Sequence, residues 1–330
     1  MSLWFAKLKK RSELQRFSLH NANNKPRNLF VKRDDLIDIN ISGNKLRKLE
    51  GNLLAAKNAG ATQLLTYGGA YSNHLLASAA AAKALHLPII GKVRGEELLP
   101  TSNALLYKCQ ELGMQLDFIS RTAYQAQKLT SGLDLKSNTW HIPEGGANPE
   151  GIWGCTQIYT EAVAQNNNQH FDAVFIAQGT TTTSLGILAS IPPSTHLFVV
   201  PVLKGFDSLA EMHTLANQAM HNSLTSPFTF LFEQVTVLDQ YHFGGYAKTT
   251  PLLLDFVTQF NQSEQFPIEP TYTGKALYAL VDQISNLHNQ AQSVLFIHTG
   301  GVFDYWTGFP IHTVYNCLNN LYKTLQQSLT

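Results

Sequence analysis

Charged residues are scarce in this chain, and their balance excludes several classes of protein. Only 14% of the 330 residues are Asp, Glu, Lys or Arg, against about 25% in an average soluble protein. The 24 basic and 23 acidic residues leave a net charge of +1, with no basic run. Without a basic surface there is no electrostatic attraction toward nucleic acid or an anionic membrane. We therefore expect neither as a partner.

Cysteines and long apolar runs are also few. The three cysteines, Cys109, Cys155 and Cys317, are widely separated and form no CxxC pair, so we expect no disulfide framework and a reducing compartment. The longest apolar stretch, 186–203, contains the pair Pro192–Pro193 and is shorter than the roughly 20 residues of a membrane span. The N-terminus, MSLWFAKLKKR, becomes basic where a signal peptide would become apolar. These features predict a cytoplasmic protein.

Short β-branched runs alternate with longer Ala- and Leu-rich runs along the chain. Gln63–Tyr67 and Pro88–Val93 have the pattern of strands, with an Ala-rich helix between them. The same pattern predicts later strands at 172–177, 196–202 and 294–298, and helices that begin near 149, 184 and 206. Such alternation is typical of an α/β fold with open, mainly parallel twisted sheets flanked by helices. The length allows two such sheets, with a ligand crevice between them.

Charge is concentrated in one segment, VKRDDLIDINISGNKLRKLE at 31–50. It holds nine of the chain's 47 charged residues, where an even distribution would place about three. A strand runs into Ser42-Gly43-Asn44, and a helix opens at Lys45. One interpretation is an N-capped helix with a solvated basic face. The other is a Schiff-base lysine, because the positive end of the helix dipole favours loss of the Lys45 proton.

Two further segments place backbone N–H groups at predicted helix starts. In GGAYSNH, at 68–74, the glycines form a tight turn and Ser72 is an N-cap, and the loop suits a carboxylate. In AQGTTTT, at 177–183, backbone amides and four hydroxyls suit a phosphate monoester. A surface threonine-rich turn is the alternative for the second segment. Neither segment matches a nucleotide-binding motif.

Tyrosines and glycines cluster again downstream, at 242–248, 272–275 and 298–301. A tyrosine is more often a core aromatic than a catalytic acid, so these segments alone leave a role for Tyr246 and Tyr272 open. The twelve histidines show no HExxH or paired spacing, and the cysteines offer no zinc set. We expect no catalytic metal.

Taken together, VKRDD, SGNKLRKLE, GGAYSNH and the late HTGG resemble the pyridoxal-phosphate enzymes of the tryptophan synthase β-like fold, fold type II. Within that fold the chain is similar to the branch of 1-aminocyclopropane-1-carboxylate (ACC) deaminase and D-cysteine desulfhydrase. The resemblance implies a large cofactor-binding domain, 1–48 and 157–330, and a small α/β domain, 49–156. It places pyridoxal 5'-phosphate in the cleft between the domains, and it implies a homodimer.

The resemblance also implies roles for single residues. Lys45 would form the Schiff base with the cofactor, Asn73 would hydrogen-bond its ring hydroxyl oxygen, and Thr299 would meet its pyridine nitrogen. Ser72 would hold the substrate carboxylate, assisted by Asn73 and His74. The remaining assignments are Tyr246 and Tyr272, which would face the substrate, and the phosphate ligands Gly179, Thr180, Thr181, Thr182 and Thr183.

Two departures from the family pattern carry information. Thr181 and Thr182 stand where the phosphate loop usually has glycine, and their Cβ atoms would restrict positive φ there. Thr273 stands where ACC deaminases typically have glutamate, and a threonine resembles the D-cysteine desulfhydrase pattern.

Three functions are consistent with this resemblance. The first is β-elimination from a small D-amino acid such as D-cysteine, with Lys45 removing the Cα proton to give pyruvate, ammonia and sulfide. The second is ACC ring opening to 2-oxobutanoate and ammonia. ACC has no Cα hydrogen, so a tyrosine such as Tyr272 would act at a ring methylene. The third is a binding protein that keeps the fold without catalysis.

Overall fold

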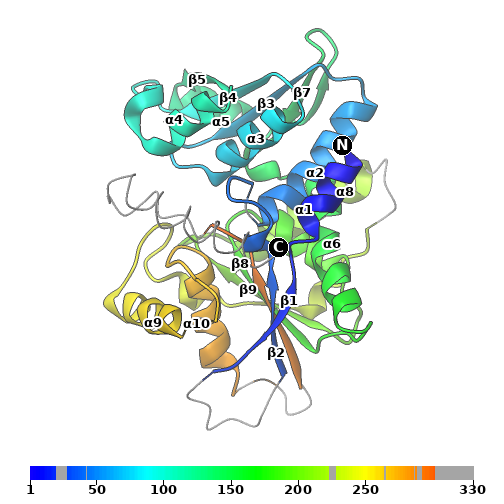
Figure 1. Cartoon of the computed structure of the whole chain (residues 1–330), viewed down its shortest axis with the longest axis vertical. Helices are drawn as coiled ribbons and strands as arrows, with labels where there is room; N and C mark the ends of the chain where they lie inside the picture. The colour runs from blue at the N-terminus through cyan, green and yellow to red at the C-terminus, as the bar shows by residue number, and fades with distance from the viewer. Residues whose placement is uncertain are drawn as a thin grey trace, which may run out of the picture.

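The computed structural model describes residues 1–19, 28–41, 43–222, 228–263, 265–285, 287 and 292–301. These residues form two sheets with helices packed around them (Figure 1). The larger sheet has the order β1 (Leu14–Phe17), β2 (Asn28–Arg33), β11 (Ser293–His298), β8 (Ala173–Gln178), β9 (His196–Pro201) and β10 (Val235–Val237). The smaller sheet has the order β5 (Gln115–Ile119), β4 (Ile89–Arg94), β3 (Gln63–Gly68), β7 (Thr139–Ile142) and β6 (Gly132–Asp134).

Most strand pairs in both sheets are parallel. The exceptions are the pairs β1–β2 and β6–β7, which lie at sheet edges and are antiparallel. The central pairs β2–β11, β11–β8 and β8–β9 are parallel, as are β4–β3 and β3–β7. This arrangement confirms the predicted α/β class with two mainly parallel sheets.

The helices cover both sheets and connect them. In Figure 1, α3, α4 and α5 lie on the smaller sheet, α9 and α10 lie beside the larger one, and α1, α2 and α6 run along one side. The α-helices are α1 (Ser2–Lys9), α2 (Asn44–Asn58), α3 (Asn73–Ala84), α4 (Ala104–Glu111), α5 (Arg121–Gln127), α6 (Pro149–Gln165), α7 (Thr182–Leu188), α8 (Ser208–Asn222), α9 (Pro251–Gln262) and α10 (Thr273–Gln283). Short 3₁₀ turns are η1 (Asp34–Leu36), η2 (Pro100–Ser102), η3 (Glu144–Gly146), η4 (Phe232–Gln234) and η5 (Asp239–His242).

Local capping signals place the helix starts well. The Ser72 hydroxyl oxygen accepts from the Leu75 N–H at 3.4 Å and caps α3, as predicted. Asn148 accepts from the Gly151 N–H at 2.9 Å at the start of α6, where proline is the first helical residue. The two helices predicted near 184 and 206 begin at Thr182 and Ser208 instead, within the usual error of sequence-based boundaries.

Hydrophobic side chains fill both faces of the larger sheet. Alternate strand residues point to opposite faces, so Val31, Phe175 and Phe296 join one core cluster. Their neighbours Phe30, Ile176 and Ile297 join the other. The smaller sheet packs on a separate core with α2, α3 and α4. The predicted domain boundaries, 48/49 and 156/157, fall inside α2 and α6 and stay predictions.

Glycines allow α2, α6 and α7 to pack with their backbones in contact. A Cβ atom at Gly51 would lie 1.9 Å from the Glu150 carbonyl oxygen, and one at Gly154 would lie 1.8 Å from the Arg47 carbonyl oxygen. A Cβ atom at Gly186, in α7, would lie 2.3 Å from Cys155 Cβ. Any larger residue at these positions must separate the helices.

Most charges of the segment 31–50 form ion pairs inside the protein. Arg47 is fully buried and pairs with Asp34 at 2.8 Å and with Glu161 at 2.6 Å. The other pairs are Lys32–Glu161 at 3.3 Å, Arg33–Asp35 at 2.7 Å and Lys9–Glu50 at 2.8 Å. The interpretation of α2 as a helix with a solvated basic face is therefore wrong. The charges join α2 to η1, to α6 and to the N-terminal helix.

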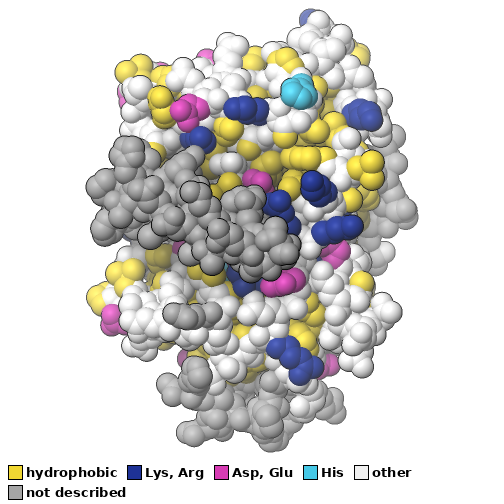
Figure 2. Space-filling view, viewed as in Figure 1, with side chains coloured by type: hydrophobic (Ala, Val, Ile, Leu, Met, Phe, Trp, Pro, Cys, Tyr) yellow, Lys and Arg dark blue, Asp and Glu magenta, His cyan; other side chains and the backbone are white. Residues whose placement is uncertain are grey.

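The surface has few charged side chains, as the composition implies. In Figure 2, neutral and hydrophobic side chains cover most of the face shown, and several Lys and Arg side chains lie near one another close to its middle. Among the helices that the structure describes, none combines the length and hydrophobicity that crossing a bilayer requires. Within these residues, no three His, Cys, Asp or Glu side chains gather closely enough to hold a metal ion.

Replacing Arg47 with methionine should strongly destabilise the chain. The substitution leaves Asp34 buried without its partner, and breaking a buried pair in this way costs about 3–5 kcal/mol. Urea titration followed by circular dichroism measures the loss. Glu111→Gln, which removes the more exposed Lys108–Glu111 pair, is the control and should move the midpoint little. Equal effects of the two substitutions would contradict the role given to Arg47.

Candidate functional site

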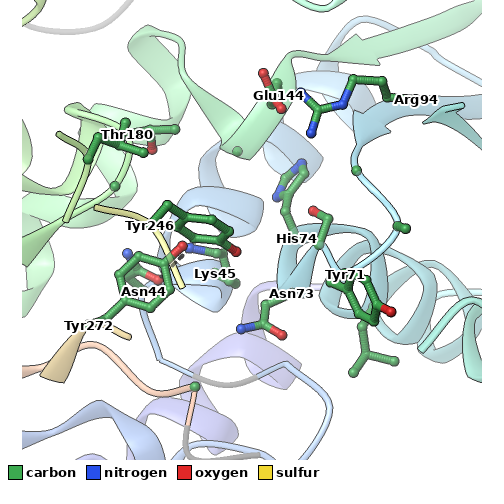
Figure 3. Close-up of a pocket in the computed structure, with 18 of the residues that line it drawn as sticks. Asn44, Lys45, Tyr71, Asn73, His74, Arg94, Glu144, Thr180, Tyr246 and Tyr272 are labelled. Atoms are coloured by element: carbon green, nitrogen blue, oxygen red, sulfur yellow. Dashed lines mark hydrogen bonds between the residues drawn. The ribbon is translucent and has the colours of Figure 1, made fainter. Parts of the chain in front are cut away.

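A pocket of about 780 Å³ opens between the two sheets (Figure 3). Its lining comes from the carboxyl ends of parallel strands, where ligands of open α/β sheets usually bind. The loop after β3 contributes 69–74, the loop after β8 contributes 179–180, and the chain after β11 contributes 299–301. Lys45 enters from the start of α2, and Tyr246 and Tyr272 come from the segments around η5 and α10.

A glycine with positive φ positions Lys45. Gly43 has φ of +63°, and a Cβ atom there would lie 1.8 Å from the Thr299 carbonyl oxygen. The Asn44 N–H donates to that same oxygen at 3.2 Å. Only glycine tolerates both the conformation and the close approach, so the junction between α2 and the chain after β11 depends on it. Ser42, the first residue of the SGNK motif, lies outside the described residues.

The side chain of Lys45 is half-buried, and among the described residues it has no carboxylate partner. Its Nζ donates to Asn44 Oδ1 at 3.0 Å, and Asn44 Nδ2 donates in turn to Thr183 Oγ1 at 2.8 Å. Burial, and then the charge of Lys48, lower the pKa of Lys45 to about 7. A substantial fraction of the side chain is therefore neutral amine near pH 7, as a Schiff-base lysine requires. The pKa of Lys45 is therefore lowered, the direction that its position at a helix start predicts.

Lys48 lies directly behind the pocket lining, against Thr180, and the sequence reasoning missed it. Its side chain is 1% exposed, and its Nζ donates to Thr180 Oγ1 at 2.9 Å. Burial lowers the pKa of Lys48 to about 8. Its position three residues after Lys45, on the same helix face, was the available signal. Among the described residues, neither lysine has a carboxylate within ion-pair distance.

Buried positive charge without a counterion, as on Lys48, is costly, and an anion bound beside the two lysines would offset that cost. Thr180 and the Lys48 ammonium already face each other, so a phosphate at this end of the pocket would find both a hydroxyl and a cation. The donor set therefore fits the phosphate of pyridoxal 5'-phosphate.

The predicted phosphate loop divides into two parts. Gly179 and Thr180 line the pocket, whereas Thr181, Thr182 and Thr183 are buried behind it. The Thr183 hydroxyl accepts from Asn44 and so supports Lys45 rather than facing the pocket. No threonine of the loop has positive φ, so the Cβ atoms at 181 and 182 impose no backbone strain. A Cβ atom at Gly179 would lie 3.1 Å from Tyr272 Cε1.

The loop after β3 presents hydrogen-bond donors at the start of α3. The first N–H groups of a helix, here those of Asn73 and His74, have no intrahelical partner, and both residues line the pocket. The Ser72 oxygen accepts from Leu75, which leaves its O–H free to donate into the pocket. A carboxylate would find these donors and the positive end of the helix dipole together.

His74 is neutral, and its tautomer follows from its neighbours. The Thr66 hydroxyl donates to the Ile142 carbonyl oxygen at 3.0 Å, so the same oxygen must accept from His74 Nε2 at 2.9 Å. Burial and the two lysines lower the pKa of His74 to about 3. Its Nδ1 is buried without a partner in the described part of the chain. That atom is an acceptor, so the His74 ring is unsuited to bind a carboxylate, and only its backbone N–H suits that predicted role.

Tyr246 and Tyr272 face each other across one side of the pocket. Their ring centroids are 6.0 Å apart at 69°, an edge-to-face contact. Burial raises the pKa of both hydroxyls above the usual value, so both stay protonated near neutral pH. The Glu269 carboxylate accepts from the Tyr272 N–H at 2.9 Å and from the Thr273 N–H at 2.7 Å. It therefore fixes the start of α10 and the position of Tyr272.

The structure thus brings most of the predicted site residues to one pocket. Those that line it are Lys45, Ser72, Asn73, His74, Gly179, Thr180, Tyr246, Tyr272 and Thr299. Thr273 does not line it, because its hydroxyl is hydrogen-bonded to the Glu269 carboxylate at 3.1 Å. The individual chemical roles stay predictions.

Comparison with known proteins identifies similar chains. The family model described as pyridoxal-phosphate dependent enzyme matches residues 11–300. A Pyrococcus horikoshii protein named "Putative 1-aminocyclopropane-1-carboxylate deaminase" is 31% identical, over 83% of this chain and 84% of its own. A D-cysteine desulfhydrase of Klebsiella pneumoniae is 30% identical, over 83% and 87%. A solved structure titled as an ACC deaminase homologue superposes with a TM-score of 0.66 at 25% identity, covering 91% of this chain and 95% of its own.

The lowered pKa of Lys45 can be measured directly on the cofactor-free chain. Competitive labelling with acetic anhydride across pH, read by mass spectrometry, should show Lys45 titrating near pH 7. Lys48→Met should move that midpoint to higher pH, because removing a positive neighbour stabilises the protonated amine. Lys57→Met, at the exposed end of α2, is the matched control and should not move it. A Lys45 midpoint close to that of the exposed lysines would refute the assignment.

Proposed function

We propose that this chain, which belongs to the family of pyridoxal-phosphate dependent enzymes, catalyses β-elimination on a small D-amino acid such as D-cysteine. The products are pyruvate, ammonia and sulfide. The observation that carries the proposal is the Lys45 amine, whose pKa is lowered to about 7, in a pocket shared with two protonated tyrosines. That pocket offers a base and acids at the same pH, as removal of a proton and departure of a thiolate require.

The residues that would hold pyridoxal 5'-phosphate surround Lys45. Lys48, Thr180 and the backbone of Gly179 would hold the phosphate, Asn73 the ring hydroxyl oxygen, and Thr299 the ring nitrogen. The cofactor, when bound, delocalises the electron pair left by cleavage of the Cα–H bond. A threonine at the ring nitrogen leaves this nitrogen without a proton, which moderates that effect.

Side chains and backbone groups of the chain bind the substrate and transfer the protons. The Ser72 hydroxyl and the N–H groups at the start of α3 bind the substrate carboxylate. The Lys45 amine takes the Cα proton. Tyr246 or Tyr272 gives a proton to the departing sulfur, since both hydroxyls are protonated and face the pocket.

ACC ring opening is the second candidate, and the names of some relatives support it, whereas others are named D-cysteine desulfhydrase. The residues that line the pocket instead support β-elimination as the first candidate and ACC ring opening as the second. Of the described lining residues, the carboxylates are Glu97 and Glu144, both from the part of the chain that holds the smaller sheet. On the side of Tyr246 and Tyr272, the lining offers hydroxyl groups only. Thr273 stands where the ACC deaminases that this chain resembles have glutamate. A non-catalytic binding protein is not favoured, because the family is one of enzymes.

We also propose a cytoplasmic homodimer. The low cysteine content supports a reducing compartment. Twofold symmetry is the commonest arrangement of soluble oligomers, and the family resemblance supports it.

Lys48→Gln should weaken cofactor binding mainly through the phosphate. Loss of a charge-assisted hydrogen bond predicts about a tenfold or larger rise in Kd for pyridoxal 5'-phosphate. The Kd for pyridoxal, which has no phosphate, should rise less, and only because loss of the Lys48 charge raises the pKa of Lys45. Fluorescence titration of the cofactor-free chain measures both. An equal loss for the two ligands would mean that Lys48 supports the fold and does not bind phosphate.

Side-by-side assays of D-cysteine and ACC test the reaction itself. The cofactor-loaded chain should release pyruvate and sulfide from D-cysteine, with little 2-oxobutanoate from ACC. Lys45→Ala should lose the visible band of the bound cofactor and reduce turnover by several orders of magnitude. Rapid 2-oxobutanoate formation with inert D-cysteine would reverse the order of the two candidates.

A further inference from the structure

Arg94 is a cation on the pocket that the proposed reaction does not use. It is the last residue of β4, its side chain is exposed, and it lines the pocket above the loop that follows β3 (Figure 3). Its Nη2 atom lies 3.4 Å from the position of a Cβ atom at Gly69. Burial raises the pKa of Tyr246, and the charge of Arg94 offsets part of that rise, so the field of Arg94 reaches the tyrosine side of the pocket.

An aromatic platform holds the guanidinium in place. Arg94 Cζ lies 5.7 Å from the ring centroid of Tyr124, a cation–π contact. Tyr124 is fully buried, its hydroxyl donates to Glu144 Oε1 at 2.7 Å, and its ring makes an edge-to-face contact with Tyr67. The platform is therefore rigid, and it contacts a face of the guanidinium without using its N–H donors.

The two neighbouring carboxylates of the pocket are already paired with other groups. Glu97 pairs with Arg121 at 2.5 Å. Glu144 accepts from Tyr124 and pairs with Lys128 at 3.3 Å. In the part of the chain that the structure describes, Arg94 has no carboxylate within ion-pair distance. It differs in this from Arg121, the other arginine of the lining.

We propose that Arg94 is a specificity-determining residue, which selects substrates that carry a second anionic group on the β substituent. This inference rests on the proposed β-elimination. The substrate α-carboxylate is bound by the donors of Ser72, Asn73 and His74. Arg94 is therefore not required for binding that carboxylate. A guanidinium with free N–H donors binds a planar carboxylate through two parallel hydrogen bonds. The pocket volume of about 780 Å³ leaves room for such a substituent.

The preferred substrate class is then a D-amino acid whose β-thioether bears a carboxylate. In the reaction the Cα–H proton is removed and the Cβ–S bond breaks, with its electron pair leaving on sulfur. One proton added to that sulfur gives a mercapto acid. Water hydrolyses the remaining enamine to pyruvate and ammonia, so no oxidant or reductant is consumed.

A matched pair of substrates isolates the second charge. S-carboxymethyl-D-cysteine and S-carbamoylmethyl-D-cysteine have nearly the same shape, and only the first carries the extra carboxylate. The loaded wild-type enzyme should show kcat/KM at least about tenfold higher for the carboxylate. Arg94→Met should reduce this ratio to about twofold or less, while its rate with D-cysteine stays near that of the wild type. Arg94→Lys should keep part of the ratio, and Arg121→Met all of it.

Binding without elimination separates this inference from the proposed function. D-glutamate and D-glutamine have no β leaving group, so calorimetry on the loaded enzyme measures their affinity whatever the reaction is. A wild-type preference for D-glutamate that Arg94→Met removes supports the role of Arg94, even if no thioether is turned over. The role of Arg94 would be overturned if the wild type preferred the charged member of neither the thioether pair nor the glutamate–glutamine pair. It would also be overturned if Arg94→Met weakened the binding of charged and neutral ligands equally.

Discussion

The close contact between α2 and α6 is the constraint on which the site depends. Gly51 and Gly154 let the two backbones touch, and the buried pair of Arg47 with Asp34 and Glu161 joins the same helix to η1 and α6. Lys45 and Lys48 lie on α2, and α7, which follows the threonine loop, packs on α6 through Gly186. The distance between the lysine side chains and Thr180 is therefore fixed by helix packing rather than by the loop.

Charge has two separate uses in the segment 31–50. Arg47, Asp34 and their neighbours are paired, so their fields cancel within the interior. Lys45 and Lys48 have no carboxylate partner among the described residues. Lys48 lowers the pKa of Lys45, and both lysines lower the pKa of His74. Within this segment, Lys45 and Lys48 therefore leave uncompensated positive potential at the pocket. An anionic cofactor and an amine that is neutral at pH 7 both require such a potential.

The features that could be predicted from the sequence are those that depend on residues close together in the chain. The alternation of strands and helices, the Ser72 and Asn148 caps and the position of Lys45 at a helix start all follow from residues a few positions apart. Lys48 and Arg94 could not be assigned in this way. Lys48 meets Thr180, 132 residues away, and the isolation of Arg94 is visible only once Glu97 and Glu144 are seen paired with other groups. The division of the threonine loop into a lining part and a buried part likewise requires the packing of α7.

The threonine loop also affects the cost of ordering the site. Its residues have ordinary φ values, and threonine, being β-branched, samples fewer conformations than glycine in an unfolded or open chain. A glycine-rich loop loses more conformational entropy when it closes on a phosphate. Here Thr182 and Thr183 are already held in the core, so the loop is preorganised. Phosphate would bind to an ordered surface, and its affinity would depend on temperature less steeply than that of a loop which orders on binding.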